Sequence, residues 1–246
     1  MNLKNIIKSG MALLLGTVLI TACKKTFDEK VSQVRDFSTS SMVQVYNGTV
    51  SASRNFIYVD TKPVNGSSLT FGGVFPGTGY GFNVPSGSSS FLIKDTLSTA
   101  TQSPLNFTPT LEAGKKYTIF MYDTITAAKQ KTVETEIVVP ADTSSRIRFA
   151  NFVFSQGAVP AVDIYSTKKM QNIFSNVNFT DVTAFIPFPS GLSDTLMVRE
   201  AGTTTNLAVM NGINPTAKRS YTLVFKGRYE TTSGSIARSL SVFPNY

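Results

Sequence analysis

The sequence contains no histidine, no tryptophan and a single cysteine in 246 residues. Without histidine, neither Ser-His-Asp nor Cys-His catalysis is available, and zinc sites of the usual His/Cys type are excluded. One cysteine cannot form an internal disulfide. Carboxylate pairs of the glycosidase type remain conceivable, but the acidic residues are spread through predicted turns and strand ends, and no local spacing pairs two of them. The sequence therefore predicts a protein that is not an enzyme and that uses no metal or cofactor.

Charged residues are also scarce, at 15% of the chain, and the basic excess gives a formal net charge of +8. The lysines and arginines are scattered, whereas nucleic-acid binding needs them clustered on a recognisable module. We therefore expect no nucleic-acid partner and interpret the charge as a solvated basic surface. The hydrophobic content of 41% is enough for packed cores. Abundant Thr, Ser, Gly, Phe and Tyr favour strands and turns over exposed helices.

The start of the chain has the three zones of a secretory leader. Lys4 and Lys8 form a positive region, an apolar run covers residues 11–20, and small residues follow. The apolar run has about half of the roughly 20 residues that a helix needs to cross a bilayer. We therefore predict a signal peptide over residues 1–22 rather than a permanent transmembrane segment.

The leader ends in Ile20, Thr21, Ala22 and Cys23, which resembles the lipobox of bacterial lipoproteins. The resemblance implies that the thiol of Cys23 receives a diacylglyceryl group, that the leader is cut just before it, and that the new amine is acylated, for example with palmitate. Two acyl chains anchor a protein stably, because each buried methylene contributes about 0.8 kcal/mol. We expect residues 23–40 to be a lipidated flexible tether. No Asp follows Cys23 directly, which favours the outer membrane, with the periplasmic or surface-facing side left open.

An internal repeat relates the two halves of the remaining chain at a constant offset of 104 residues. The matching pairs are Pro85-Ser86-Gly87 with Pro189-Ser190-Gly191, Tyr117-Thr118-Ile119 with Tyr221-Thr222-Leu223, Val43 to Asn47 with Ile147 to Asn151, and Phe75 with Phe179. Apolar and polar residues alternate with a period of two, and turn residues interrupt the runs at the spacing of a sandwich. We therefore predict an all-β fold of two tandem immunoglobulin-like β-sandwich domains, over residues 41–141 and 142–246.

The same alternation predicts individual strands. One is expected over residues 132–139, with a buried face made of Val133, Thr135, Ile137 and Val139. Another is expected around Tyr221, Leu223 and Phe225, and residues 239–243 are expected to form an ordinary closing strand.

The second repeat resembles domain-of-unknown-function family 4397. The residues that carry the resemblance are the strand ending at Asn151, the turn at Pro160, and the segments Val162-Asp163-Ile164-Tyr165, Pro189-Ser190-Gly191 and Ala201-Gly202-Thr203. The first repeat is similar more loosely, because residues 56–60 depart from the strand pattern. The family occurs in secreted and lipid-anchored bacterial proteins, often as tandem copies, and has no established activity. The resemblance therefore implies fold and compartment, and it transfers no site residues.

A glycine-rich stretch over residues 72–81 carries three aromatic residues, Phe71, Phe75 and Tyr80, in or beside it. A phosphate-binding loop would lead into a helix, whereas this stretch leads into a predicted strand and turn. The aromatic side chains are candidates for stacking on a sugar or docking a partner. Packing in the core is the alternative, and the recurrence of Phe75 as Phe179 favours it.

Three Asp-Thr-aliphatic segments resemble the acceptor sequence of the periplasmic O-glycosylation system of Bacteroidota. Their threonines are Thr96, Thr124 and Thr195. The resemblance implies that these hydroxyls are candidate O-glycosylation sites.

Together these features predict a lipid-anchored cell-envelope protein of unknown molecular activity, serving as a non-enzymatic binding or structural module. The expected partners are membrane lipid through acylated Cys23, and a glycan or another envelope protein. Two alternatives stay open. One is a glycan-binding accessory lipoprotein of a polysaccharide-uptake system, against which the lack of tryptophan counts. The other is a fimbrial or adhesin-type subunit that polymerises by strand exchange.

Overall fold

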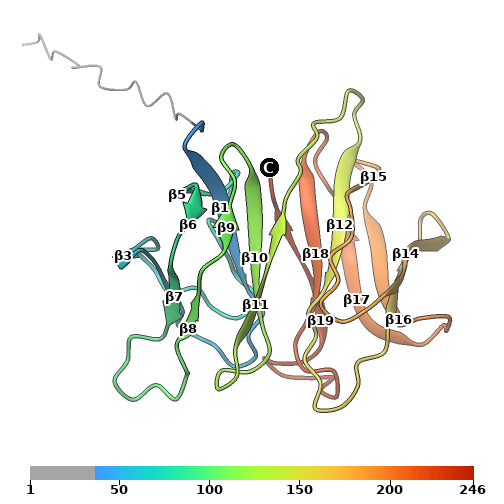
Figure 1. The fold of residues 1–246 in the computed structure, drawn as a ribbon. Coiled ribbons are helices and arrows are strands. Elements are labelled where there is room, and N and C mark those ends of the chain that lie inside the picture. Colours follow the sequence, from blue (N-terminus) through green and yellow to red (C-terminus); the bar gives the residue numbers. More distant parts are fainter. Residues whose placement is uncertain (1–36) are drawn as a thin grey trace, which may run out of the picture. The chain divides into compact units, whose positions relative to one another are not determined.

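The computed structural model describes residues 37–246 (Figure 1). The regular elements of this range are all β-strands, so the predicted all-β class is confirmed. The predictions for the signal peptide, for Ile20, Thr21, Ala22 and Cys23, and for most of the tether fall outside the described residues.

The first half folds into two facing sheets. One sheet has the order β11-β10-β1-β4, with β5 also paired to β1, and the other has the order β3-β2-β7-β8. The core between them contains Val45, Ile57, Phe91, Ile93 and Ile119, all fully buried. The strands are β1 (Ser40–Asn47), β2 (Phe56–Val59), β3 (Lys62–Pro63), β4 (Val74–Phe75), β5 (Phe82–Pro85), β6 (Gly87–Ser88), β7 (Phe91–Lys94), β8 (Leu105–Phe107), β9 (Thr110–Leu111), β10 (Lys116–Tyr122) and β11 (Lys129–Glu134).

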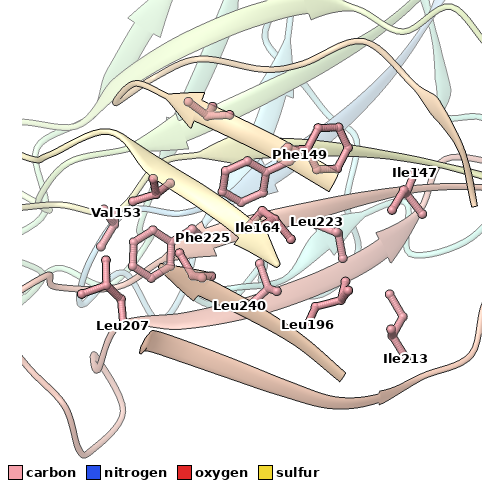
Figure 2. Close-up of a cluster of buried hydrophobic side chains, with 14 of the residues drawn as sticks. Ile147, Phe149, Val153, Ile164, Leu196, Leu207, Ile213, Leu223, Phe225 and Leu240 are labelled. Carbon is pink, nitrogen blue, oxygen red and sulfur yellow. The ribbon is translucent and has the colours of Figure 1, made fainter. Parts of the chain in front are cut away.

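The second half is a sandwich of two four-stranded sheets, β15-β12-β18-β19 and β14-β13-β16-β17. Figure 2 shows the core between them, where Phe149, Ile164, Leu196, Leu223 and Phe225 are completely buried. The strands are β12 (Ser145–Asn151), β13 (Val162–Ser166), β14 (Gln171–Val177), β15 (Ile186–Phe188), β16 (Asp194–Glu200), β17 (Asn206–Ile213), β18 (Ser220–Lys226) and β19 (Ser239–Pro244).

Strand register repeats at the offset of 104 residues. Residues 42–47 of β1 pair in parallel with residues 116–121 of β10, one for one. Residues 146–151 of β12 pair in parallel with residues 220–225 of β18 in the same register. The central strand pair of the first half therefore recurs in the second half without a shift.

Local hydrogen bonds recur at the same offset. The pairs are Glu112 N to Tyr117 Oη and Thr216 N to Tyr221 Oη, Ser41 Oγ to Val84 O and Ser145 Oγ to Phe188 O, and Ser86 Oγ to Thr39 O and Ser190 Oγ to Thr143 O. The tyrosine bonds resemble the tyrosine corner of immunoglobulin-type sandwiches, in which a tyrosine hydroxyl bonds the backbone a few residues upstream. The two halves therefore share more than their sequence motifs, although the boundary between residues 141 and 142 stays a prediction.

The strand predicted over residues 132–139 is shorter than its pattern indicates. β11 ends at Glu134, and Thr135 still donates its N–H to Lys116 O at 2.7 Å. Beyond that bond the chain leaves β10, and Val138 and Val139 are 57% and 49% exposed. The alternation predicted the wrong end because the segment that crosses to β12 keeps the same apolar-polar pattern. The closing strand fits its prediction, since β19 pairs with β18 at six positions.

The two sandwiches contact each other through the outer faces of the sheets that contain β1 and β12. Phe120 stacks on Phe152 with 4.7 Å between ring centroids, and Tyr46 stacks on Phe243 at 5.4 Å. Ala150 belongs to the same buried cluster. The central strands of both halves are thus buried on both faces, which a period of two does not reveal.

Candidate functional site: a groove between the two halves

A groove of about 580 Å³ opens between the two halves of the described chain. Its walls come from the end of β11, the segment after it, β12, and the segment that leads into β15. The lining residues are Val133, Glu134, Glu136, Val138, Arg146, Arg148, Val182, Thr183, Ala184, Phe185 and Pro187. This volume lies within the range of ligand pockets in proteins, about 300–1,000 Å³.

Arg148 lies at the base of the groove and is almost completely buried, with 2% of its surface exposed. Its Nε donates to Thr222 Oγ1 at 2.9 Å, and its Nη2 donates to Thr118 Oγ1 at 2.8 Å and to Thr135 Oγ1 at 3.0 Å. The Nη1 group makes a longer contact of 3.5 Å with the carbonyl oxygen of Glu134. This guanidinium therefore ties the two halves together through neutral acceptors.

The charge of Arg148 has no counter-ion in the described part of the chain. No carboxylate of residues 37–246 lies within ion-pair distance of its guanidinium. Burial lowers the pKa of Arg148 to about 9, which reflects the cost of holding a cation away from water. Its guanidinium carbon also lies 4.8 Å from the ring centroid of Phe185. Buried charges are normally paired, so this cation leaves an unbalanced positive charge beside the groove.

The rim carries further charges. Arg146 stands two residues before Arg148, on the same face of β12, and is half-buried. Glu134 is held by Lys115, whose Nζ lies 3.0 Å from Glu134 Oε2. Glu136 lies at the exposed rim. The groove thus combines Arg148 at its base with Arg146 and two glutamates at its rim.

The corresponding place in the other half is filled by the chain itself. Gln44, which is equivalent to Arg148 by the offset, donates to Pro244 O at 3.1 Å and accepts from Asn245 Nδ2 at 3.0 Å. Beyond these residues the ring of Tyr246 stacks on Tyr80, with 4.5 Å between centroids and 18° between planes. Tyr246 also lies 4.9 Å from the guanidinium carbon of Arg219. One side of the contact between the halves is therefore closed by two aromatic rings, and the other side is open.

The structure places the three candidate loop aromatics in separate surroundings. Phe75 packs beside the first core and lies 5.6 Å from Phe82, centroid to centroid. The ring of Phe71 lies 4.3 Å from the Nζ of Lys226, and Tyr80 stacks on Tyr246. The contacts of these three rings are made within the chain and do not gather them around one opening.

Two of the three Asp-Thr-aliphatic segments come together. A second hollow of about 190 Å³ is lined by Asp95, Leu97 and Ile125 among other residues, at one end of the first sandwich. The hydroxyl-bearing Thr96 beside it is exposed, and Thr124 is half-buried. Thr195 lies apart from them, half-buried within β16.

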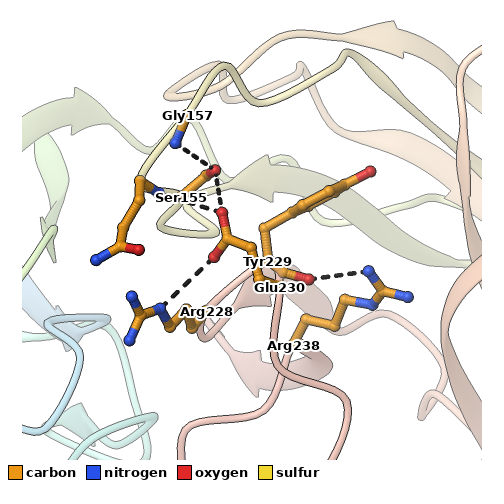
Figure 3. A network of polar contacts seen from close by, with 7 residues as sticks. Ser155, Gly157, Arg228, Tyr229, Glu230 and Arg238 are labelled. Carbon is orange, nitrogen blue, oxygen red and sulfur yellow. Dashed lines mark hydrogen bonds and ion pairs between the residues drawn. The ribbon is translucent and has the colours of Figure 1, made fainter.

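A polar cluster at an end of the second sandwich holds two loops together (Figure 3). Ser155 Oγ and Gln156 N donate to one carboxylate oxygen of Glu230, and Arg228 Nε lies 3.6 Å from the other. The bond from Ser155 is the main reason why the pKa of Glu230 is lowered. Arg238 donates to Tyr229 O at 2.9 Å. These contacts join the loop that contains Ser155 to the loop that contains Glu230, so we assign the cluster a structural role.

Sequence reasoning missed the groove and its two arginines. The signal was available in the repeat itself, because the offset makes Met42 equivalent to Arg146 and Gln44 equivalent to Arg148. Two uncharged residues on one strand face of the first copy are thus charged in the second. Among residues 37–246 no group of three or more acidic or cysteine side chains is placed to hold a metal ion. The described part of the chain also has no helix of the length and apolar character needed to cross a membrane.

These features define an all-β protein of two packed sandwiches with a ligand-sized groove between them. The family described as "Domain of unknown function (DUF4397)" matches residues 41–165, about half of the chain, and the chain belongs to that family. The match covers the first repeat and continues into β13, whereas the sequence motifs predict the clearer resemblance in the second repeat. A second family copy is not among the matches, so the tandem family copies stay a prediction.

No curated protein matches the chain. Among solved structures, the chain is similar to CBMbc (family CBM26) from Eubacterium rectale Amy13K, whose crystal structure is in complex with maltoheptaose. The likeness has 12% sequence identity and a TM-score of 0.26, and covers 83% of this chain and 96% of that chain.

Proposed function

We propose that this protein is a non-catalytic binding module of the cell envelope, and that the groove between its two halves is its binding site. The observation that carries the proposal is the asymmetry of the contact between the halves. The side closed by Tyr80 and Tyr246 needs no ligand, whereas the opposite side leaves about 580 Å³ open above a buried, unbalanced arginine. Pockets of this volume with a few convergent polar groups are the usual form of a ligand site.

A groove-filling substitution tests this proposal in the detergent-solubilised full-length protein. Ala184→Tyr installs the residue that stands at the equivalent position of the first half, Tyr80, and should narrow the groove by adding an aromatic ring to its lining. We expect the parent protein to be retarded in affinity gels containing at least one polysaccharide from a panel of neutral and acidic ones, and A184Y to migrate freely. Leu192→Tyr, at a position 61% exposed and outside the groove, is the matched control. Equal retardation of A184Y and the parent, or no retardation by any polysaccharide, would refute the proposal.

Lipid on Cys23 is proposed as the anchor, and the outer membrane as the location. The support is the sequence alone, because the leader ends in the small residues and cysteine of a lipobox. Cys23→Ser should move the protein from the washed membrane fraction to the soluble fraction, since multiple acyl chains supply the membrane affinity. An unmodified thiol at Cys23 in the intact mass of the native protein would contradict the anchor and leave the groove proposal untouched.

Of the two alternatives, the glycan-binding accessory lipoprotein is favoured by the groove, whose mixed charged and apolar lining suits a polar ring. The strand-exchanging subunit receives no comparable support. Its edge would need a strand from another chain, whereas β19 is supplied by this chain and pairs with β18 from Lys226 to Tyr221.

A further inference from the structure

The internal repeat provides a template for the ligand of the groove, and the inference rests on the proposed binding function. On the side of the contact that Tyr80 and Tyr246 close, the equivalent face of β1 presents Met42 and Gln44, both uncharged. On the open side, the corresponding face of β12 presents Arg146 and Arg148, and both side chains line the groove. On this strand face the charges therefore appear only on the side where the space is open. The cations of the closed side, Lys116 and Arg219, lie against the rings of Tyr80 and Tyr246. The uncovered arginine charge of the open side points to a ligand that carries negative charge.

The same comparison describes the shape of the missing group. Tyr80 on the closed side corresponds by the offset to Ala184 on the open side. Thr135 and Asn245 make equivalent bonds, to Lys116 O and Ser220 O, so the next residues, Glu136 and Tyr246, also correspond. Two stacked rings on one side are thus replaced by a small side chain and a rim carboxylate on the other. The open side has a ring of its own in Phe185, which lies against Arg148 at the position equivalent to Gly81. The groove beside it is large enough for a ring-shaped group.

We propose that the groove binds a carboxylate-bearing sugar residue, such as the uronic acid unit of an acidic polysaccharide. Arg146 and the weakly engaged Nη1 group of Arg148 would bind the sugar carboxylate, because guanidinium groups bind carboxylates with strong, directional hydrogen bonds. The apolar faces of Phe185 and Pro187 would contact the sugar ring.

The rim glutamates favour a sugar over an acidic peptide. Glu134 and Glu136 accept hydrogen bonds, which suits the hydroxyl groups that surround a sugar carboxylate. An acidic peptide would bring further carboxylates to this rim, where like charges repel. Glu134 is already engaged by Lys115, so Glu136 carries most of this selectivity.

The test compares a galacturonic acid trimer with a galactose trimer by calorimetric titration of the full-length protein in detergent. We expect the acidic trimer to bind, its affinity to fall with added salt, and the neutral trimer to bind at least about tenfold more weakly. Arg146→Met introduces the residue found at the equivalent position of the first half, Met42. It should lower the affinity for the acidic trimer by about tenfold or more. Arg199→Met removes one positive charge from a half-buried arginine outside the groove and should leave the affinity for both trimers unchanged.

Glu136→Gln provides a variant whose effect has the opposite sign, because removing the rim charge should strengthen binding of the acidic trimer and leave the neutral one unchanged. A protein that binds both trimers equally and loses both in A184Y would overturn the acidic-sugar inference while the binding function stands. Arg146-dependent binding of a polyglutamate peptide in place of the trimer would also overturn it. Absence of any groove-dependent ligand would overturn both proposals.

Discussion

The two halves of this protein share the central strand pairs at their contact and differ in their outer sheets. The central pairs β1–β10 and β12–β18 share length and register, since each pair spans six matched positions. The outer sheets differ in size: β3 and β8 have two and three residues, whereas β14 and β17 have seven and eight. The strands of the contact are buried on both faces, so any change there disturbs two clusters at once. The outer sheets each pack against one core.

The strongest test of this comparison removes matched core side chains. Ile119 and Leu223 are equivalent by the offset, and both are fully buried, one in each core. Truncation of either to alanine should lower the free energy of unfolding by about 2–5 kcal/mol. Because the cluster around Phe120 and Phe152 joins the halves, we expect one cooperative transition in denaturant titrations of both variants. Two separated transitions would show that the halves unfold independently.

A turn carboxylate offers a second, smaller comparison. Asp194 is buried and accepts bonds from Ser166 Oγ, Thr167 Oγ1 and Lys168 N, which fix the turn between β13 and β14. Burial raises the pKa of Asp194, but these bonds outweigh burial and the pKa is lowered. Asp194→Asn should cost about 1–3 kcal/mol at neutral pH.

The pH dependence of that cost follows from the lowered pKa. A carboxyl group whose folded pKa lies below its unfolded value stabilises the fold above the unfolded value, and this contribution is lost as the pH falls through the folded one. The difference between the parent and D194N should therefore shrink on acidification below about pH 4. Asp60→Asn is the matched control, since the exposed Asp60 accepts a single bond, from Ser90 N, in the equivalent turn of the first half. Equal costs for the two variants would break the comparison.

The closed side of the contact is tested with Tyr246→Ala. Loss of the stacked pair should cost about 1 kcal/mol. Burial, with help from Tyr246, raises the pKa of Tyr80 to about 12. We expect that pKa to fall toward 10 in the variant, measured by the absorbance of tyrosinate. The opened space should bind the galacturonic acid trimer at least about tenfold more weakly than the groove, because Met42 and Gln44 stand in place of Arg146 and Arg148. Lys116 and Arg219 remain beside the removed ring, so a second site of equal affinity in Y246A would show that the two groove arginines are not what selects the ligand.

The smallest expected effect concerns the candidate O-glycosylation sites. Thr96 is exposed, whereas Thr124 and Thr195 are half-buried. If the native protein carries hexose-scale additions in its intact mass, Thr96→Val should remove most of them while changing stability by no more than about 0.5 kcal/mol. An unchanged mass distribution in T96V would assign the modification elsewhere.

Much of the fold could be predicted from local patterns. The repeat, the period of two and the turn residues gave the all-β class and the sandwiches, because side-chain alternation and turn chemistry depend on neighbours in the chain. The end of β11 was placed too late, since Ile137 and Val139 continue the alternation after the chain has left β10. The face of β18 that carries Thr222 and Val224 is buried rather than solvated, because the other half packs against it.

The candidate site was beyond local patterns for the same reason. Arg148 appears in the sequence as a polar residue of an alternating strand, yet its partners Thr118, Thr135 and Thr222 come from three separate segments. The glycine-rich stretch predicts a site at Phe71, Phe75 and Tyr80, whereas these three rings contact other residues of the chain.

The amino-acid sequence by itself determined most of the strands, the two-fold repeat and the likeness of residues 20–23 to a lipobox, because each depends on local residue patterns. The tertiary structure alone decided which outer faces are buried, which side of the contact Tyr246 closes, and where two arginines meet an open space. The partners of Arg148 lie 13, 30 and 74 positions from it, and 166 positions separate Tyr80 from Tyr246. Only packing brings such residues within reach of one another.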